Sequence, residues 1–303
     1  MSFLYMIEKI RIPVLNELML AVTTLGEETA FLVIALIIFW CVDKKKGYYV
    51  MAVGFAGTIL NQILKLACRV PRPWVLDPNF SILEQAREAA AGYSFPSGHT
   101  QCAVCTFGSI AAFTEKKALR LTCVILAVLV GFSRMYVGVH TPADVLTAAA
   151  CALLLIFAFK RPVLNGTVKQ MKLAIGVVMA MAVMFLIYVE LWQFPQDMDM
   201  HNLTSGYKNA YTMMGCMIGV AIVYVADLKW INFSTEAKWW IQIIKVIAGL
   251  GLVLAVKEGL RIPLEMILPV YPARAVRYFL IVITAGAVWP MSFQYLSKIG
   301  VKK

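Results

Sequence analysis

Charged residues are scarce in this sequence. Asp, Glu, Lys and Arg make up 15% of the 303 residues and hydrophobic residues 61%, and the mean hydropathy is +0.76. Soluble globular domains contain about 25% charged residues. The composition therefore excludes an ordinary soluble domain and predicts a protein that crosses a membrane several times.

Acidic residues are the rarer charged type, with 17 against 28 Lys and Arg, which leaves a net charge of +11. A basic protein can bind nucleic acid, but here the basic residues lie mainly at the ends of apolar segments and no aromatic-basic motif accompanies them. Orientation in the membrane and contact with anionic headgroups explain the charge better. We therefore expect membrane lipids as partners and no nucleic acid.

Metal ligands are sparse too. Among the seven cysteines, Cys102 and Cys105 form the one pair at metal-like spacing and no second pair follows, which favours small buried residues over a zinc site. Asp197, Asp199 and His201 stand in a polar loop, where solvated acidic residues are the ordinary finding. We predict no metal site and no cofactor.

Apolar segments predict an all-α fold, a polytopic membrane helical bundle of about nine transmembrane helices. The expected spans are residues 28–42, 47–65, 98–114, 118–133, 142–159, 172–191, 210–227, 239–256 and 278–296. Residues 1–27 lack the uninterrupted apolar region and cleavage site of a signal peptide, so we expect an interfacial amphipathic segment. Residues 28–160 then form a helical core, and residues 161–303 add transmembrane helices to which the sequence assigns no role.

Three fragments of the core concentrate the polar chemistry. They read Lys65-x6-Arg72-Pro73, Pro96-Ser97-Gly98-His99 and Ser133-Arg134-x5-His140-x3-Asp144. Three cations can clamp a phosphoryl group, Ser and Gly at a helix start can present donors, and two histidines can attack phosphorus and protonate a leaving group. The chain has three histidines, and the presence of two of them here predicts phosphate transfer to a histidine.

Single residues of these fragments also have simpler interpretations. Lys65 alone is typical of a lysine at the membrane interface, and Ser97 of an ordinary helix N-cap. Asp144 stands in the first turn of a predicted helix, where it either caps that helix or accepts the N–H of His140 and fixes its tautomer. The shared face of the three basic residues favours phosphate binding for them, whereas both roles stay open for Asp144.

The fragments match the three-part signature of the type 2 phosphatidic acid phosphatase superfamily, which are integral-membrane lipid phosphatases. Around them, Thr24–Glu28 and Gly138–Asp144 resemble most the branch with sphingosine-1-phosphate phosphatases and their bacterial relatives. The resemblance implies a metal-independent phosphatase with a phosphohistidine intermediate, in which His140 is the nucleophile, His99 acts as acid and then base, and Asp144 orients His140. The phosphate pocket that it implies consists of Lys65, Arg72, Ser97, Gly98 and Arg134.

The implied substrate is a lipid phosphate, either sphingosine-1-phosphate-like or a polyprenyl phosphate or pyrophosphate, with phosphatidic acid close behind. Two alternatives stay open: a lipid phosphotransferase, which uses an alcohol instead of water, and a non-catalytic protein that binds or transports lipid phosphates. Transporters tend to place binding groups near the membrane midplane, whereas these fragments lie at one interface. The sequence predicts no oligomeric state.

Span lengths predict the side of the membrane. From Lys46 to Lys65 a helix rises about 29 Å, one hydrocarbon thickness, so these two lysines lie on opposite faces. Continued along the chain, the same alternation brings all three fragments to one face and most of the remaining lysines to the other. Because lysine-rich loops stay cytoplasmic, we expect the site on the extracytoplasmic or lumenal face.

Overall fold

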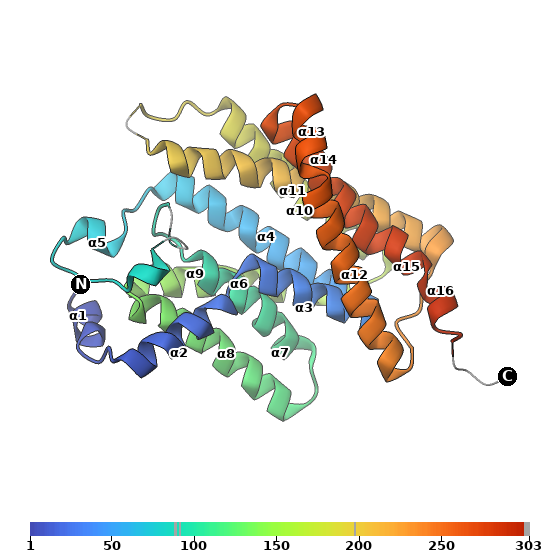
Figure 1. Ribbon diagram of the computed structural model, residues 1–303, viewed down its shortest axis with the longest axis horizontal. Coiled ribbons are helices and arrows are strands. Elements are labelled where there is room, and N and C mark those ends of the chain that lie inside the picture. The colour runs from blue at the N-terminus through green and yellow to red at the C-terminus, as the bar shows by residue number, and fades with distance from the viewer. Residues whose placement is uncertain (88–89, 91, 197, 300–303) are drawn as a thin grey trace. The chain divides into compact units, whose positions relative to one another are not determined.

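The computed structural model describes residues 1–87, 90, 92–196 and 198–299 (Figure 1). These residues contain helices and no strand, which confirms the all-α class. The helical elements are α1 (Ser2–Glu8), α2 (Pro13–Thr24), α3 (Glu28–Cys41), α4 (Lys44–Cys68), α5 (Pro73–Leu76), η1 (Glu84–Ala86), α6 (Gly98–Ala103), η3 (Val104–Gly108), α7 (Ser109–Phe113), α8 (Lys117–Tyr136), α9 (Pro142–Leu164), α10 (Val168–Leu191), α11 (Met200–Ala226), η4 (Asp227–Ile231), α12 (Trp239–Gly259), α13 (Arg261–Ile267), α14 (Val270–Ile283), η5 (Thr284–Val288), α15 (Trp289–Met291) and α16 (Phe293–Leu296).

Seven helical segments of the described residues are long and apolar enough to cross a membrane. They are Lys44–Leu76, Lys117–Tyr136, Pro142–Leu164, Val168–Leu191, Met200–Ile231, Trp239–Ile267 and Val270–Leu296. A protein with this many spanning helices is a multi-pass membrane protein, as the sequence predicts.

The other two expected spans are helical to within one residue of the expected ends, but neither is among the seven segments by itself. Helix α3 has 14 residues and meets α2 at a bend of 52°, and this bent pair passes as an eighth span only if it is counted as one. The span expected over 98–114 is occupied by α6, the π-helical turn η3 and α7, which follow one another without a break and end at Phe113. The π turn shifts the hydrogen bonding locally but the backbone stays helical on both sides of it.

The described chain forms two compact units. The first contains Met1–Leu32, Val53–Arg161 and Gln193–Gly206, and the second contains Val33–Ala52, Pro162–Trp192 and Tyr207–Lys303. All three signature fragments belong to the first unit, together with a short segment from the second half of the chain.

Helix α8 packs against α2, α6 and α7 in the first unit (Figure 1). Cys123, Ala127, Val130 and Arg134 are buried three or four positions apart, so one stripe of the helix faces its neighbours, and the last turn is buried more widely. Where α8 turns into α9, Gly138 adopts φ +88, a conformation that residues with a Cβ avoid. A core cluster beside this turn anchors it: Ile7, Met19, Ala86, Ala90, Tyr136, Val137 and Val139.

The second unit holds one half-buried and one buried lysine through polar contacts. Lys44 Nζ lies 2.8 Å from Asp227 Oδ2. Lys245 is fully buried and donates to the carbonyls of Ser234 and Thr235 at 3.3 and 3.4 Å. The carbonyl partners give Lys245 a structural role in holding the segment between η4 and α12.

Candidate active site

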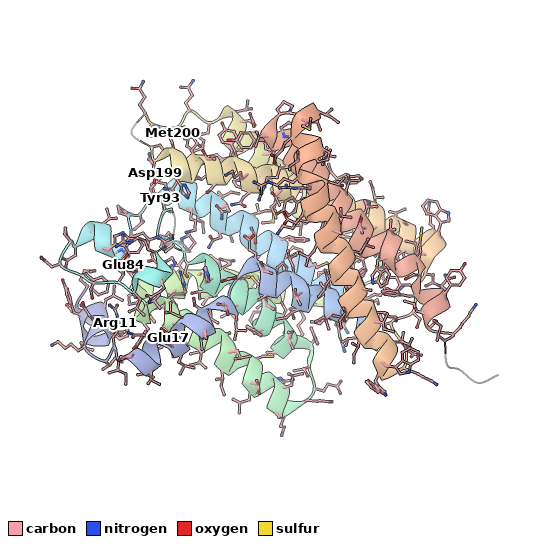
Figure 2. The ribbon with its side chains drawn as sticks, in the orientation of Figure 1. Arg11, Glu17, Glu84, Tyr93, Asp199 and Met200 are labelled. Carbon is pink, nitrogen blue, oxygen red and sulfur yellow. The ribbon has the colours of Figure 1, made fainter. Side chains whose placement is uncertain are left out.

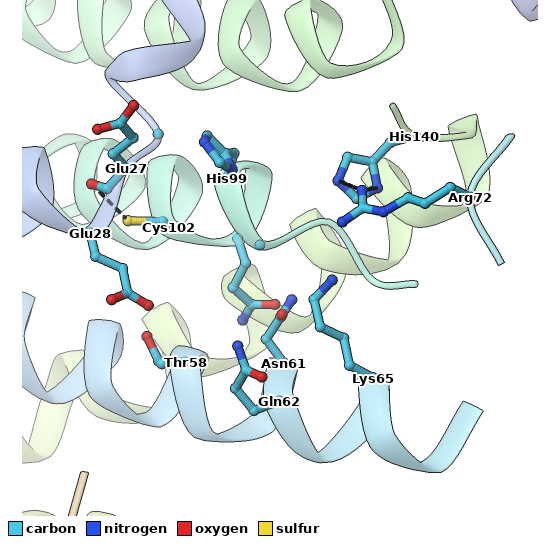
Figure 3. A pocket seen from close by; sticks show the side chains of 13 residues that line it. Glu27, Glu28, Thr58, Asn61, Gln62, Lys65, Arg72, His99, Cys102 and His140 are labelled. Atoms are coloured by element: carbon cyan, nitrogen blue, oxygen red, sulfur yellow. Dashed lines mark hydrogen bonds between the residues drawn. The ribbon is translucent and has the colours of Figure 1, made fainter. Parts of the chain in front are cut away.

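A cavity of about 260 Å³ lies in the first unit, lined by α4, α6, the α2–α3 bend and the α8–α9 turn (Figure 3). Five predicted site residues line it: Lys65, Arg72, Gly98, His99 and His140. The other three, Ser97, Arg134 and Asp144, are at most 1% exposed and are held by neighbouring groups. Residues up to 79 positions apart in sequence, from Lys65 to Asp144, are therefore assembled in one unit.

Backbone carbonyls hold the first fragment. Lys65, in the last turn of α4, donates to the Tyr93 carbonyl at 2.6 Å. The chain leaves α4 at Arg69, whose φ is +51, and Arg72 then precedes α5. Arg72 donates through Nε to the Gly92 carbonyl at 2.8 Å and through Nη1 to the Val139 carbonyl at 2.9 Å. Both cations are thus fixed beside the cavity by neutral acceptors.

The second fragment begins a helix. Ser97 is the N-cap of α6, as predicted, and its Oγ accepts the N–H of Thr100 at 3.4 Å. Its own N–H donates to the Asp144 carbonyl at 3.1 Å, which ties the second fragment to the third. His99, the second residue of α6, lines the cavity, and its buried Nε2 has no hydrogen-bond partner within the described residues.

Arg134 supplies a third cation behind the cavity. It is fully buried in the last turn of α8, and its Nη1 donates to Thr23 Oγ1 at 2.6 Å. Its Nε and Nη2 have no partner among residues 1–87, 90, 92–196 and 198–299. A buried guanidinium with unpaired donors is unfavourable by itself and favours an anion beside it.

One carboxylate oxygen serves both roles considered for Asp144. Asp144 Oδ2 accepts the Ser94 hydroxyl at 2.5 Å and the Thr141 N–H at 2.7 Å. The same oxygen lies 3.4 Å from His140 Nδ1. Asp144 therefore caps α9 and also lies beside the imidazole ring, so the two roles are compatible in one side chain.

Contacts of His140 define which ring nitrogen has a lone pair to offer. Arg72 Nη1 lies 2.9 Å from His140 Nε2 (Figure 3). A guanidinium only donates, so Nε2 accepts and the ring proton is on Nδ1, near Asp144 Oδ2 and Ser94 Oγ, both at 3.4 Å. Burial holds the pKa of His140 well below its ordinary value, and the nearby Arg72, Arg134 and Lys65 lower it further. The imidazole is therefore neutral at neutral pH.

Several residues of the site are not among those predicted. Ser94 links Asp144 and His140, and Thr23 holds Arg134. Gly26 lines the cavity, and a Cβ there would come within 2.8 Å of the His99 carbonyl oxygen, so the chain passes His99 closely at this point. Of these, only Gly26 has a signal in sequence, since it falls in the Thr24–Glu28 stretch that resembles the phosphatase family.

The acidic loop considered as a metal site holds a different arrangement. Asp197 lies outside the described residues. Asp199 accepts the N–H of His201 at 2.7 Å and the side-chain amide of Asn202 at 2.9 Å. Across the described part of the chain, no group of three or more His, Cys, Asp or Glu residues is arranged to hold a metal ion.

Comparison with known proteins finds two matching regions and several relatives. Residues 45–166 match the PAP2 superfamily, and residues 211–300 match the PAP2 superfamily phosphatase, transmembrane extension. Phosphatidylglycerophosphatase B of Bacillus subtilis (strain 168) is 34% identical over 166 residues, which cover 50% of this chain and 76% of the relative. Undecaprenyl-diphosphatase BcrC of the same strain is 34% identical over 119 residues, which cover 39% of this chain and 58% of the relative.

A solved structure is also similar. The crystal structure of a transmembrane PAP2 type phosphatidylglycerolphosphate phosphatase from Bacillus subtilis has 31% sequence identity and a TM-score of 0.45. The match covers 52% of this chain and 81% of that one.

Proposed function

This chain belongs to the PAP2 superfamily of membrane phosphatases, and we propose that it removes the terminal phosphate of a membrane lipid through a phosphohistidine formed on His140. The observation that carries the proposal is the meeting of two histidines and two basic side chains, Lys65 and Arg72, around one cavity. Such a cavity supplies a nucleophile, a proton donor and cationic charge within reach of one phosphoryl group.

In the first step the Nε2 lone pair of His140 attacks phosphorus and the bond from phosphorus to the lipid oxygen breaks. Burial and the nearby Arg134, Arg72 and Lys65 lower the pKa of His99 to about 3, so His99 takes up its proton together with the anionic phosphate, whose charge offsets these cations. His99 then gives this proton to the lipid oxygen, so the lipid leaves as a neutral alcohol or, from a diphosphate, as a monophosphate. A phosphoryl group in the cavity also accepts the Arg72 N–H that is otherwise donated to His140 Nε2, and this frees the lone pair of Nε2 for the attack.

In the second step water attacks the phosphohistidine. His99, now neutral, accepts a proton from that water, the bond between phosphorus and Nε2 breaks, and inorganic phosphate leaves. Asp144, 3.4 Å from Nδ1, stabilises the positive charge that the ring gains while phosphate is bound.

Cationic groups supply the stabilisation of the transition state. The charge that develops on the phosphoryl oxygens is stabilised by Lys65 and Arg72 at the cavity and by the unpaired Nε and Nη2 of Arg134 behind it. Ser97 and Gly98 contribute the N-terminus of α6, although the short helix makes this contribution the smaller one. Because these residues provide the positive charge, the proposed reaction proceeds without a metal ion.

The substrate we propose is a lipid that ends in a phosphate. The names of the two curated relatives specify phosphatidylglycerophosphate and undecaprenyl diphosphate. From the sequence, sphingosine-1-phosphate-like lipids and polyprenyl phosphates are also candidate substrates. We place the reaction on the extracytoplasmic or lumenal face, because the α8–α9 turn with His140 and the Lys116–Lys117 turn stand at opposite ends of α8 and lysine-rich turns favour the cytoplasm.

The experiment that tests this function measures phosphate release by the purified full-length protein in detergent. The panel contains phosphatidylglycerophosphate, undecaprenyl diphosphate and monophosphate, sphingosine-1-phosphate and phosphatidic acid. At least one lipid should be hydrolysed, and His140→Ala should remove that activity. His201→Ala is the matched control, because this third histidine is exposed and absent from the cavity lining. Absence of turnover on the whole panel, or full turnover by His140→Ala, would contradict the proposal.

A further inference from the structure

Gly92–Ser94, here named the clamp segment, holds both cations of the first fragment. The Gly92 carbonyl accepts Arg72 Nε at 2.8 Å, and the Tyr93 carbonyl accepts Lys65 Nζ at 2.6 Å. A carbonyl gives each cation a fixed direction without neutralising its charge. The position of the clamp segment therefore sets where both positive charges stand relative to the cavity.

Asn202 holds the clamp segment from outside the signature. Its Oδ1 accepts the Tyr93 N–H at 2.7 Å, and the side chain is 7% exposed. Gly92 has φ +89, and a Cβ there would come within 2.4 Å of the same Oδ1. The amide of Asn202 thus lies directly against the backbone that carries the two carbonyls.

Asp199 in turn fixes which end of the Asn202 amide faces the clamp segment. Asn202 Nδ2 donates to Asp199 Oδ2 at 2.9 Å, and Asp199 Oδ1 accepts the His201 N–H at 2.7 Å. The amide nitrogen is therefore committed to Asp199, which leaves Oδ1 for Tyr93. Figure 2 shows Asp199 at the start of α11 and Tyr93 on the neighbouring segment.

Helix α11 begins close to α4 at this point. A Cβ on Gly206 would come within 2.8 Å of Leu66 Cδ1, and Leu66 follows Lys65 in α4. Gln193–Gly206 belongs to the same compact unit as the signature fragments. The described part of this segment is thus packed where it can fix the site, even though it lies more than 48 residues beyond Asp144 in the chain.

We propose that Asn202 is a positioning residue for phosphoryl transfer: through the Tyr93 N–H it places the carbonyls that aim Lys65 and Arg72. The inference rests on the proposed phosphatase function. It assigns a role in the reaction to the first turn of α11, which carries no part of the signature. If the cations that stabilise the charge of the transition state are displaced, kcat falls. The loss of a purely structural contact instead lowers stability and leaves each folded molecule equally active.

The test uses the full-length protein in detergent and two readouts on correctly folded fractions: kcat and KM on the best lipid of the panel, and the inhibition constant of orthovanadate. We expect Asn202→Ala to lower kcat by about 10- to 100-fold and to weaken vanadate binding in parallel, with KM within about threefold of the original. His201→Ala, one position away and with only its backbone N–H in the network, should leave all three values unchanged.

A donor–acceptor exchange keeps the test valid if Asn202→Ala does not fold. Asn202→Asp alone sets a second carboxylate against Asp199 and should lower kcat. Adding Asp199→Asn returns a donor to that contact while an oxygen still accepts the Tyr93 N–H, so the double variant should recover most of the lost kcat and vanadate affinity.

Two results would overturn the proposal: kcat and vanadate affinity of folded Asn202→Ala within twofold of the original, or a double variant no better than Asn202→Asp. A wild-type protein that neither hydrolyses the lipids nor binds vanadate would instead refute the phosphatase function on which the inference rests.

Discussion

Asp144 allows catalysis and helix capping to be separated by experiment. Asp144→Asn keeps an oxygen for the Thr141 N–H but removes the negative charge 3.4 Å from His140 Nδ1. We expect kcat to fall by about 10²- to 10⁴-fold, as when a carboxylate that orients a catalytic histidine is replaced by an amide. The cap survives in part, so the free energy of unfolding should fall by only about 1 kcal/mol.

Thr141→Ala is the matched control for this substitution. Thr141 Oγ1 accepts the Asp144 N–H at 3.3 Å, and the hydroxyl of Thr141 takes no part in the contact between Asp144 and His140. Its loss should lower the free energy of unfolding by about 0.5–2 kcal/mol, the usual cost of removing an N-cap hydroxyl, with kcat nearly unchanged. Phosphate release and thermal unfolding in the same detergent measure both quantities. Equal losses of kcat in the two variants would show that Asp144 acts only as a cap.

Three further predictions concern pH, metal and topology. The pKa of His140 is held below its ordinary 6.5, so kcat/KM should decline with falling pH only well below 6.5. Lys65→Met removes one of the cations that lower this pKa and should move the decline to higher pH. The unfolding free energy should also fall below pH 6.5, because the unfolded chain then binds a proton that folded His140 refuses. Chelators should leave turnover unchanged and vanadate should compete with substrate; activity lost in EDTA and restored by zinc or magnesium would contradict this. In a cysteine-free background, a thiol at exposed Glu84 should react with an impermeant reagent in intact cells and one at Lys117 should not; the reverse pattern would invert the orientation.

Much of the fold can be predicted because transmembrane helices leave a strong signal. Seven of the expected spans correspond to helices long and apolar enough to cross a membrane. The helix expected over 98–114 is found over α6, η3 and α7, but the π turn at Val104–Gly108 has no signal in hydropathy, which measures composition and not hydrogen bonding. The 52° bend between α2 and α3 contains Gly26, where a Cβ would come within 2.8 Å of the His99 carbonyl oxygen, and such a contact between distant residues has no signal in hydropathy either.

The signature residues can be located from sequence because unusual polar residues stand out against apolar helices. The residues that hold them cannot. Thr23 and Arg134 are 111 positions apart, and Tyr93 and Asn202 are 109 apart. Single hydroxyl and amide residues in loops or at helix ends are common in any sequence, and only the three-dimensional packing selects which of them meet a cation or a carboxylate.

Direct detection of the phosphohistidine tests the central proposal. In His99→Ala the hydrolysis of the intermediate lacks its base, while an aryl phosphate with a good leaving group needs no acid to form it. The His99→Ala variant is mixed with the aryl phosphate, the reaction is quenched at alkaline pH and the peptides are mapped by mass spectrometry. One phosphoryl group should be found on His140, and none in the double variant that carries both His99→Ala and His140→Ala. A phosphoryl group on another residue, or continued turnover of the aryl phosphate by His140→Ala, would contradict the account.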